Sequence, residues 1–275
     1  MINFNGEIIS KNEFHLSSQN RAFKYGDAIF DTLKFSQDKI YFIEDHYFRL
    51  MSSMRMLRMT IPMNFTLKYY EDEILKTIEN NVFNDEIRIR VSVFRKEGGL
   101  YKPKSLEVDF FIEINPINKV VSTAYEIELF KDFSIYSGLL STIKTNNRMV
   151  NILSSIYASE NNYNNCVLIN ERKNIVEANN ANIFLIKENQ IITPALTEGC
   201  INGIIRNKII ELMANNNDYK LVEASISPFE LLKADEVFLT NSIFEIKSVT
   251  KYRKKTFLTV KTEEVRKLFI EKYLN

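Results

Sequence analysis

The sequence predicts a mixed α/β (or α+β) fold in two domains, because strand and helix patterns alternate along the chain and one turn-rich stretch interrupts them. Helical segments show apolar residues at three- and four-residue spacing, whereas strand segments alternate or run apolar. The interruption is NPINK, residues 115–119, which follows a nearly continuous apolar strand. We therefore expect a smaller N-terminal domain over residues 1–114, a linker over 115–120 and a larger C-terminal domain over 121–275.

In the N-terminal part, two amphipathic helices separate two pairs of strands. The predicted strands cover residues 2–9, 29–35, 86–94 and 106–114, and the predicted helices cover 43–59 and 64–83. Asp45 suits the N-cap position of the first helix. Arg88 and Arg90 lie two residues apart on one strand and so share a face. Such a pair could hold a substrate carboxylate or belong to an exposed sheet face.

The C-terminal part alternates more evenly. The predicted strands cover residues 133–143, 165–170, 174–178, 182–186, 235–241 and 245–250, and the predicted helices cover 148–161, 202–215 and 227–234. The basic cluster from Lys251 to Lys255 lies between two apolar runs, so we expect a solvated hairpin turn there.

Composition narrows the function. Lys and Arg number 36 against 35 Asp and Glu, so the near-neutral charge gives no reason to expect a nucleic-acid or membrane-surface partner. No apolar run reaches the ~18 residues of a membrane span and no basic-then-apolar leader follows Met1, so we expect a cytoplasmic protein. Two cysteines and two histidines predict no metal site. The 7 glycines form no Gly-rich phosphate loop motif.

Two charged residues stand where a polar group is unexpected. Lys144 follows a predicted strand and precedes a predicted helix, where partial burial would make its neutral amine a nucleophile. Judged in isolation, a lysine at such a position is more often a surface lysine. Glu177 interrupts two apolar runs, and a carboxylate there either has a cationic or hydrogen-bonding partner or sits in an exposed hairpin.

Three further features could bind an anion. The helix that starts near Asn202 would present the amides of Gly203, Ile204 and Ile205 to a phosphate, or it is simply a capped helix. The strand ending in Thr240-Asn241-Ser242 carries short hydrogen-bond donors, or forms an ordinary turn. Arg49, on the first helix, is by default a solvated arginine whose stem covers apolar surface. Each feature is weak alone.

In combination, these features resemble the class IV (fold-type IV) pyridoxal-phosphate enzymes, which include branched-chain aminotransferases, D-amino-acid aminotransferases and aminodeoxychorismate lyases. The similarity runs from FNGEI and RAFKYGDAIFDTLK through DHYFRL to ADEVFLTNSIFEI. Its densest part is the order Glu177, Asn182-Ile183-Phe184, Ile191-x-Thr193, Ile201-x-Gly203-Ile204-x-Arg206. The resemblance implies a D-amino-acid aminotransferase-like two-domain fold, a homodimer and pyridoxal 5′-phosphate as cofactor.

The resemblance also implies a role for each candidate. Lys144 matches the lysine that forms the internal aldimine, and Glu177 matches the carboxylate that keeps the pyridine nitrogen protonated. Phosphate donors would be Arg49, the amides of Ile204 and Ile205, and Ser242. Substrate contacts would come from Tyr25, Phe30, Arg90 and Arg148.

These motifs point to different subfamilies. Phe30 stands where D-amino-acid aminotransferases typically carry a tyrosine, and RKEGGLYKP replaces their Arg-x-His element. Arg90 aligns with the carboxylate-binding arginine of branched-chain aminotransferases. The KTNNR stretch is closer to the KxLNR of aminodeoxychorismate lyases, as is GCINGIIR, but EGGLY lacks the arginine of the lyase GGRGY.

We therefore expect a class IV aminotransferase whose small-molecule substrates are a branched-chain-like amino acid and a 2-oxo acid. Aminodeoxychorismate lyase, which eliminates pyruvate from aminodeoxychorismate to leave 4-aminobenzoate, is the close alternative. A non-catalytic binding protein of the same fold is a third, although such a protein would be expected to lose Lys144 or Glu177, and both are present.

Overall fold

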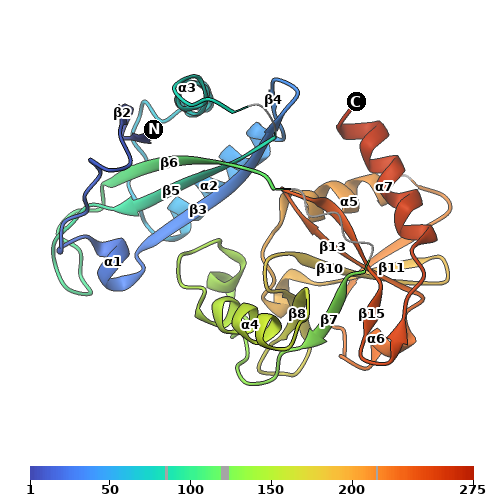
Figure 1. The fold of residues 1–275 in the computed structure, drawn as a ribbon. Coiled ribbons are helices and arrows are strands. Elements are labelled where there is room, and N and C mark those ends of the chain that lie inside the picture. The colour runs from blue at the N-terminus through green and yellow to red at the C-terminus, as the bar shows by residue number, and fades with distance from the viewer. Residues whose placement is uncertain (84–85, 119–123, 215) are drawn as a thin grey trace. The chain divides into compact units, whose positions relative to one another are not determined.

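A computed structural model describes residues 1–83, 86–118, 124–214 and 216–275, and the chain divides into two compact units (Figure 1). Unit 1 comprises Met1–Lys119 with Lys144–Asn147, and unit 2 comprises Val120–Ile143 with Arg148–Asn275. This division differs from the predicted one at Lys144, which we expected in the C-terminal domain. Residues 115 and 116 of the expected linker end a strand, and 119 and 120 lie outside the described residues.

Unit 1 is built on one antiparallel sheet of six strands in the order β2-β1-β6-β5-β3-β4. These strands are β1 (Ile2–Phe4), β2 (Glu7–Ile9), β3 (Ala28–Ser36), β4 (Lys39–Ile40), β5 (Ile87–Arg95) and β6 (Val108–Pro116). Strand β5 shows the alternation that the sequence predicts, because Ile87, Ile89 and Val91 are buried while Arg88 is exposed and Arg90 half-buried.

The described part of unit 1 also contains the helices α1 (Arg21–Tyr25), α2 (Ile43–Met56) and α3 (Leu67–Glu79). Helix α2 packs on β3, and α3 packs on β6 and β1. The expected N-cap at Asp45 is wrong, since the helix already begins at Ile43 and Asp45 lies in its first turn, where a carboxylate suits the positive end of the helix dipole. Thr66 caps α3 by accepting from the N–H of Tyr69.

Unit 2 contains two five-stranded sheets with an apolar core that draws on both. One sheet has the order β12-β11-β10-β13-β14 and the other β16-β15-β7-β8-β9. The strands are β7 (Glu126–Leu129), β8 (Asn165–Ile169), β9 (Ile175–Ala178), β10 (Asn182–Lys187), β11 (Gln190–Pro194), β12 (Lys220–Ala224), β13 (Glu236–Asn241), β14 (Glu245–Val249), β15 (Lys251–Tyr252) and β16 (Lys255–Thr256). The last two strands form the hairpin expected at the basic cluster.

The helices of unit 2 are α4 (Met149–Glu160), α5 (Ile204–Ala214), α6 (Glu230–Lys233) and α7 (Val260–Tyr273), with short 3-10 turns η1 (Leu139–Thr142) and η2 (Leu196–Glu198). Residues 133–143 were expected as a strand, and this is wrong. Only Ile135 makes a strand-like bridge, to Asn170, and the 3-10 turn η1 follows. An apolar run of this length does not distinguish a strand from a turn whose apolar side chains are exposed, as those of Tyr136, Leu139 and Leu140 are here.

Both cysteines of unit 2, Cys166 and Cys200, are free and buried. Burial raises the pKa of each thiol to about 12, so neither is a nucleophile near neutral pH. Among the described residues, none of the helices combines the length and apolar character needed to cross a bilayer.

Candidate functional site

Lys144 belongs to unit 1 because its backbone pairs with the start of β3. The N–H of Phe30 donates to the Lys144 carbonyl at 2.9 Å, and the N–H of Asn146 donates to the Ala28 carbonyl at 2.9 Å. Between them, Thr145 forms an antiparallel bridge with Ile29. Residues 144–146 therefore extend the sheet, and this pairing holds the half-buried Lys144 on rigid backbone.

The aromatic ring of Phe30 is in contact with the side chains of Lys144 and Arg90. The Nζ atom of Lys144 is 4.4 Å from the ring centroid, and the guanidinium carbon of Arg90 is 3.6 Å from it. Both distances are within cation–π range, so the ring gives each cation a fixed neighbour without neutralising it. Arg90 also donates to Asn146 Oδ1 at 3.3 Å. The structure thus brings two predicted residues, Arg90 and Lys144, to the aromatic ring of a third, Phe30.

Tyr25 ends α1 and is tied to the lysine segment through its neighbour. Gly26 caps the helix in the left-handed conformation, with φ of 61°, and its carbonyl accepts from Asn147 Nδ2 at 3.3 Å. A Cβ at Gly26 would overlap the Asn147 side chain, so the close approach needs glycine. Both asparagines of KTNNR therefore make structural contacts. Asn146 accepts a hydrogen bond from Arg90, and Asn147 donates one that fixes the turn after Tyr25.

Arg49 is held by a carboxylate that sequence reasoning missed. Its Nε donates to Asp31 Oδ2 at 2.9 Å and its Nη2 donates to Asp31 Oδ1, so the pair is bidentate. Asp31 Oδ1 also lies 2.7 Å from His46 Nδ1. A signal for Asp31 was available, because it shares the buried face of β3 with Ile29 and Leu33, where a carboxylate requires partners.

The charges of this cluster follow from its geometry. Burial acts to raise the pKa of Asp31, but the neighbouring Arg49 and His46 outweigh it and lower that pKa below its usual value. Burial lowers the pKa of His46. At neutral pH the cluster therefore contains an ionised Asp31, a cationic Arg49 and a neutral His46 whose Nδ1–H donates to the carboxylate.

Glu177 is the carboxylate of the second group of predicted residues, which lies in unit 2. It stands on β9 and is buried, with 4% of its surface exposed. Its Oε2 accepts from the N–H of Ile201 at 2.9 Å. Glu177 does lie on the second strand of the β8–β9 hairpin, but the exposure that the alternative requires is wrong, and the carboxylate is bonded to the loop that leads into α5.

Arg148 lies on the other side of the same carboxylate. Its Nη1 is 4.0 Å from Glu177 Oε1, and its Nη2 donates to the carbonyls of Ile143 and Ser141. The pair is largely desolvated, with 15% of the Arg148 side chain and 5% of the Glu177 side chain exposed. Burial lowers the pKa of Arg148 and the Glu177 charge opposes that effect, so the arginine stays cationic.

The start of α5 is arranged as an anion-binding helix terminus. The first intrahelical bond runs from the N–H of Asn207 to the carbonyl of Gly203, so the amides of Ile204 and Ile205 precede it and have no acceptor one turn back. Asn182 shapes this turn by donating to the Ile201 carbonyl at 2.8 Å. A Cβ at Gly203 would overlap Asn182 Oδ1, so both residues are fixed by close contact.

The remaining signature residues have separate roles. Ser242 is half-buried and follows β13, in a turn where Asn241 Oδ1 accepts from the N–H groups of Ile243 and Phe244. Arg206 is 1% exposed and donates to the Pro194 carbonyl and to Glu223. Arg206 therefore joins α5 to strands β11 and β12 and is a structural residue.

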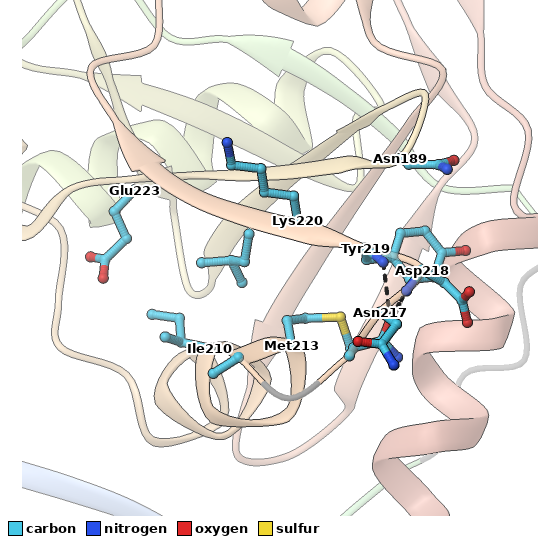
Figure 2. Close-up of a pocket in the computed structure, with 11 residues that line it drawn as sticks. Asn189, Ile210, Met213, Asn217, Asp218, Tyr219, Lys220 and Glu223 are labelled. Atoms are coloured by element: carbon cyan, nitrogen blue, oxygen red, sulfur yellow. Dashed lines mark hydrogen bonds between the residues drawn. The ribbon is translucent and has the colours of Figure 1, made fainter.

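Unit 2 also contains a hollow beside α5. It has a volume of about 750 Å³ between the end of α5 and β12, and Met213, Ile210, Tyr219 and Lys220 are among its lining residues (Figure 2). The backbone N–H groups of Asp218 and Tyr219 both donate to Asn216 Oδ1. None of the residues that the resemblance assigns lines this hollow. Within the described ranges, no cluster of His, Cys, Asp and Glu is suited to a metal ion.

Comparisons with known proteins show the family of this chain. The amino-transferase class IV model matches residues 28–252. A probable branched-chain-amino-acid aminotransferase of Aquifex aeolicus (strain VF5) is 26% identical, over 90% of this chain and 82% of that protein. The aminodeoxychorismate lyase of Vibrio harveyi is 23% identical, over 86% and 87%, and a D-alanine aminotransferase of Listeria innocua is 25% identical, over 90% and 85%.

A solved structure matches the whole fold. The crystal structure of the branched-chain amino acid aminotransferase from Thermobaculum terrenum, in its PLP form, aligns with a TM-score of 0.85 at 20% identity. The match covers 98% of this chain and 92% of that one. The fold class predicted from the sequence is therefore confirmed, while an identity this low leaves the reaction open.

Proposed function

Because this chain belongs to the amino-transferase class IV family, we propose that it is a pyridoxal 5′-phosphate-dependent aminotransferase that moves an amino group from a branched-chain-like amino acid to a 2-oxo acid. The observation that carries the proposal is the hydrogen bond from the Ile201 N–H to Glu177 Oε2. It joins the buried carboxylate on β9 to the loop that opens α5, so a partner for a ring nitrogen and amide donors for a phosphate are held in a fixed relation within unit 2.

The donor set fits this cofactor. Glu177 would hold the proton on the pyridine nitrogen, and the Ile204 and Ile205 amides, the Ser242 hydroxyl and Arg49 would hold the phosphate. When bound, pyridoxal 5′-phosphate supplies an aldehyde that bonds to amines and a protonated ring that withdraws electrons. Lys144 would carry the cofactor between turnovers, and its amine would then move the proton at the Cα of the amino acid.

Arg90 supports recognition of an amino acid in this proposal. Its guanidinium is fixed by Phe30, Ser92 and Asn146, and it is only partly neutralised by Glu113 at 3.7 Å. A pre-oriented guanidinium next to the Lys144 amine suits a small molecule with a carboxylate beside its amino group. Tyr25 and Arg148 would complete the substrate contacts.

The test begins with the purified protein reconstituted with pyridoxal 5′-phosphate. We expect a visible absorbance band that disappears when sodium borohydride reduces the bond to Lys144 and so fixes the cofactor to it covalently, together with glutamate formation from an amino acid and 2-oxoglutarate. Lys144→Ala should lose both the band and at least about a hundredfold in rate. Lys96→Ala, which removes an exposed lysine paired with Glu107, should lose neither. A wild-type protein that binds no cofactor would refute the proposal.

Aminodeoxychorismate lyase is the second candidate, and Arg148 favours it. This arginine of KTNNR occupies the motif position that matches the lyase pattern, and in the structure it faces Glu177. The two reactions are separated by one paired assay. Pyruvate release from aminodeoxychorismate without any 2-oxo acid would support the lyase, and glutamate formation from 2-oxoglutarate supports the transferase. A non-catalytic binding protein would give neither product.

A homodimer in the cytoplasm completes the proposal. Exposed apolar side chains cluster in sequence on η1 and α4: Leu139, Leu140, Met149, Ile152 and Ile156, each at least 49% exposed. Such residues are typical of an interface with another protein surface, and a second copy of this chain is the partner we propose. The two free cysteines support a reducing compartment.

A further inference from the structure

The cluster of Asp31, His46 and Arg49 combines a fully buried end with a partly exposed one. Asp31 is 1% exposed and His46 is 0% exposed, whereas 13% of the Arg49 side chain reaches the surface of unit 1. The carboxylate and the imidazole thus lie behind the guanidinium. The partly exposed Arg49 guanidinium is therefore oriented by the buried Asp31 behind it.

The elements that carry the cluster leave it little freedom. Asp31 is on the central part of β3, and His46 and Arg49 are three residues apart on one face of α2, which packs on that strand. Asp31 engages Nε and Nη2 of Arg49, which is one edge of the planar guanidinium. A bidentate pair of this kind fixes the rotation of the fork as well as its distance.

A second arginine–aspartate cluster in the same unit shows what a purely structural pair looks like. Asp27 accepts from Arg21 at 2.8 Å and from Arg95 at 3.0 Å. The other donors of Arg95 are directed to the backbone carbonyls of Leu57 and Arg58. There the arginine is the more buried partner, with 8% of its side chain exposed against 16% for Asp27. At Arg49 that order is reversed.

We propose that Asp31 is a positioning residue for the cofactor phosphate, which acts by holding the Arg49 guanidinium in its binding orientation, with His46 holding Asp31 in turn. The inference rests on the proposed function, because it takes Arg49 as a phosphate donor. A guanidinium ordered in advance loses less conformational entropy when the anion binds. Asp31 also offsets the Arg49 charge, so positioning and charge make opposite predictions for phosphate affinity.

The test compares pyridoxal 5′-phosphate with pyridoxal, which lacks the phosphate, in the full-length protein. The dissociation constant of pyridoxal divided by that of pyridoxal 5′-phosphate measures how much the phosphate contributes to binding. A change in overall stability alone would not alter this ratio. For Asp31→Asn we expect this ratio to fall about tenfold, as loss of a charge-assisted hydrogen bond would give. Asp27→Asn, the matched control, should lower the thermal midpoint and leave the ratio unchanged.

One further variant, Arg49→Lys, keeps the test decisive if Asp31→Asn folds poorly, and a double variant checks that Asp31 acts through Arg49. Arg49→Lys keeps the cation but cannot form the bidentate pair, so the ratio should again fall. Asp31→Asn added to Arg49→Gln should lower the ratio no further than Arg49→Gln alone, since Asp31 acts through Arg49. An unchanged or increased ratio in Asp31→Asn or in Arg49→Lys would overturn the inference. A wild type that binds neither compound would remove the proposed function and this inference together.

Discussion

At the scale of single residues, Glu177 shows how neighbours define a side chain. One oxygen accepts from the Ile201 amide and the other lies 4.0 Å from Arg148. A glutamine at residue 177 would keep the hydrogen bond from the Ile201 amide, because its side-chain oxygen can still accept. It would lose the ion pair with Arg148, because it has no charge. In the proposed function, the charge acts on Arg148 and on a cationic ring nitrogen.

We therefore expect Glu177→Gln to bind pyridoxal 5′-phosphate but to turn over about a hundredfold more slowly, because it lacks the charge that keeps the ring protonated. The measurement is the rate of glutamate formation together with the visible spectrum of the loaded protein. Glu107→Gln, at an exposed partner of Lys96, is the control and should match the wild type. Equal rates in Glu177→Gln and the wild type would contradict the role.

At the scale of elements, the loop between η2 and α5 depends on one close contact. Gly203 lies against the Asn182 amide, and the same amide holds the Ile201 carbonyl. A methyl group at residue 203 would push the first turn of α5 away from β10. The donors of that turn, the Ile204 and Ile205 amides, would move with it.

Gly203→Ala should therefore lower stability by about 1–3 kcal/mol, as overpacking does, and weaken pyridoxal 5′-phosphate binding. Gly138→Ala is a matched control, because a Cβ there meets nothing within 4 Å. Adding Asn182→Ala to Gly203→Ala should relieve the overlap, so the two stability changes should not add. Chemical denaturation of the wild type, Gly203→Ala, Asn182→Ala and the double variant measures the coupling, and strict additivity would rule out the contact as the cause.

Glu198 makes a second prediction at this scale, one that depends on pH. Burial acts to raise its pKa, but hydrogen bonds from Ser225, Arg172, Asn174 and Asn170 outweigh it and lower the pKa from 4.5 to about 2. These bonds connect η2 to the β8–β9 turn and to the loop after β12. A depressed carboxyl pKa stabilises the fold above the unfolded value, and this stabilisation is lost as pH falls towards 2.

The stability of the wild type should thus decline between pH 4.5 and about 2, by roughly 3 kcal/mol from this group. Glu198→Gln should be less stable at neutral pH and should show a flatter profile across that window. Urea denaturation at a series of pH values measures both curves. Parallel curves would mean that Glu198 is not the group responsible.

At the scale of the whole molecule, the proposed assembly is the property to test. Ile152 and Ile156 lie one turn apart on α4, and both are about half exposed. Replacing both with lysine places two charges in the proposed interface, which should shift the protein from dimer to monomer in sedimentation velocity. Lys267→Glu on α7, at a 79%-exposed side chain, should leave the mass unchanged. A wild type that sediments as a monomer would contradict the dimer.

Much of this molecule follows from local sequence patterns. The alternation of β5, the amphipathic spacing of α2 and α3 and the hairpin of the basic cluster are all local, and their predictions are confirmed. The order of signature residues from Glu177 to Arg206 predicted the family, because class IV enzymes keep these residue types in chain order. Residues 133–143 were mispredicted since apolar character alone does not specify a strand.

The partners of the charged site residues are set by contacts between residues that lie far apart in the sequence. Nothing local indicates that Lys144 pairs its backbone with β3, that Arg148 faces Glu177 or that Asp31 holds Arg49. Each of these pairs joins residues separated by 18 to 114 positions, and their approach depends on how the sheets and helices of one unit pack. Residue types and their order are written in the chain, whereas the partner that gives a charge its orientation is fixed by the burial of that charge during folding.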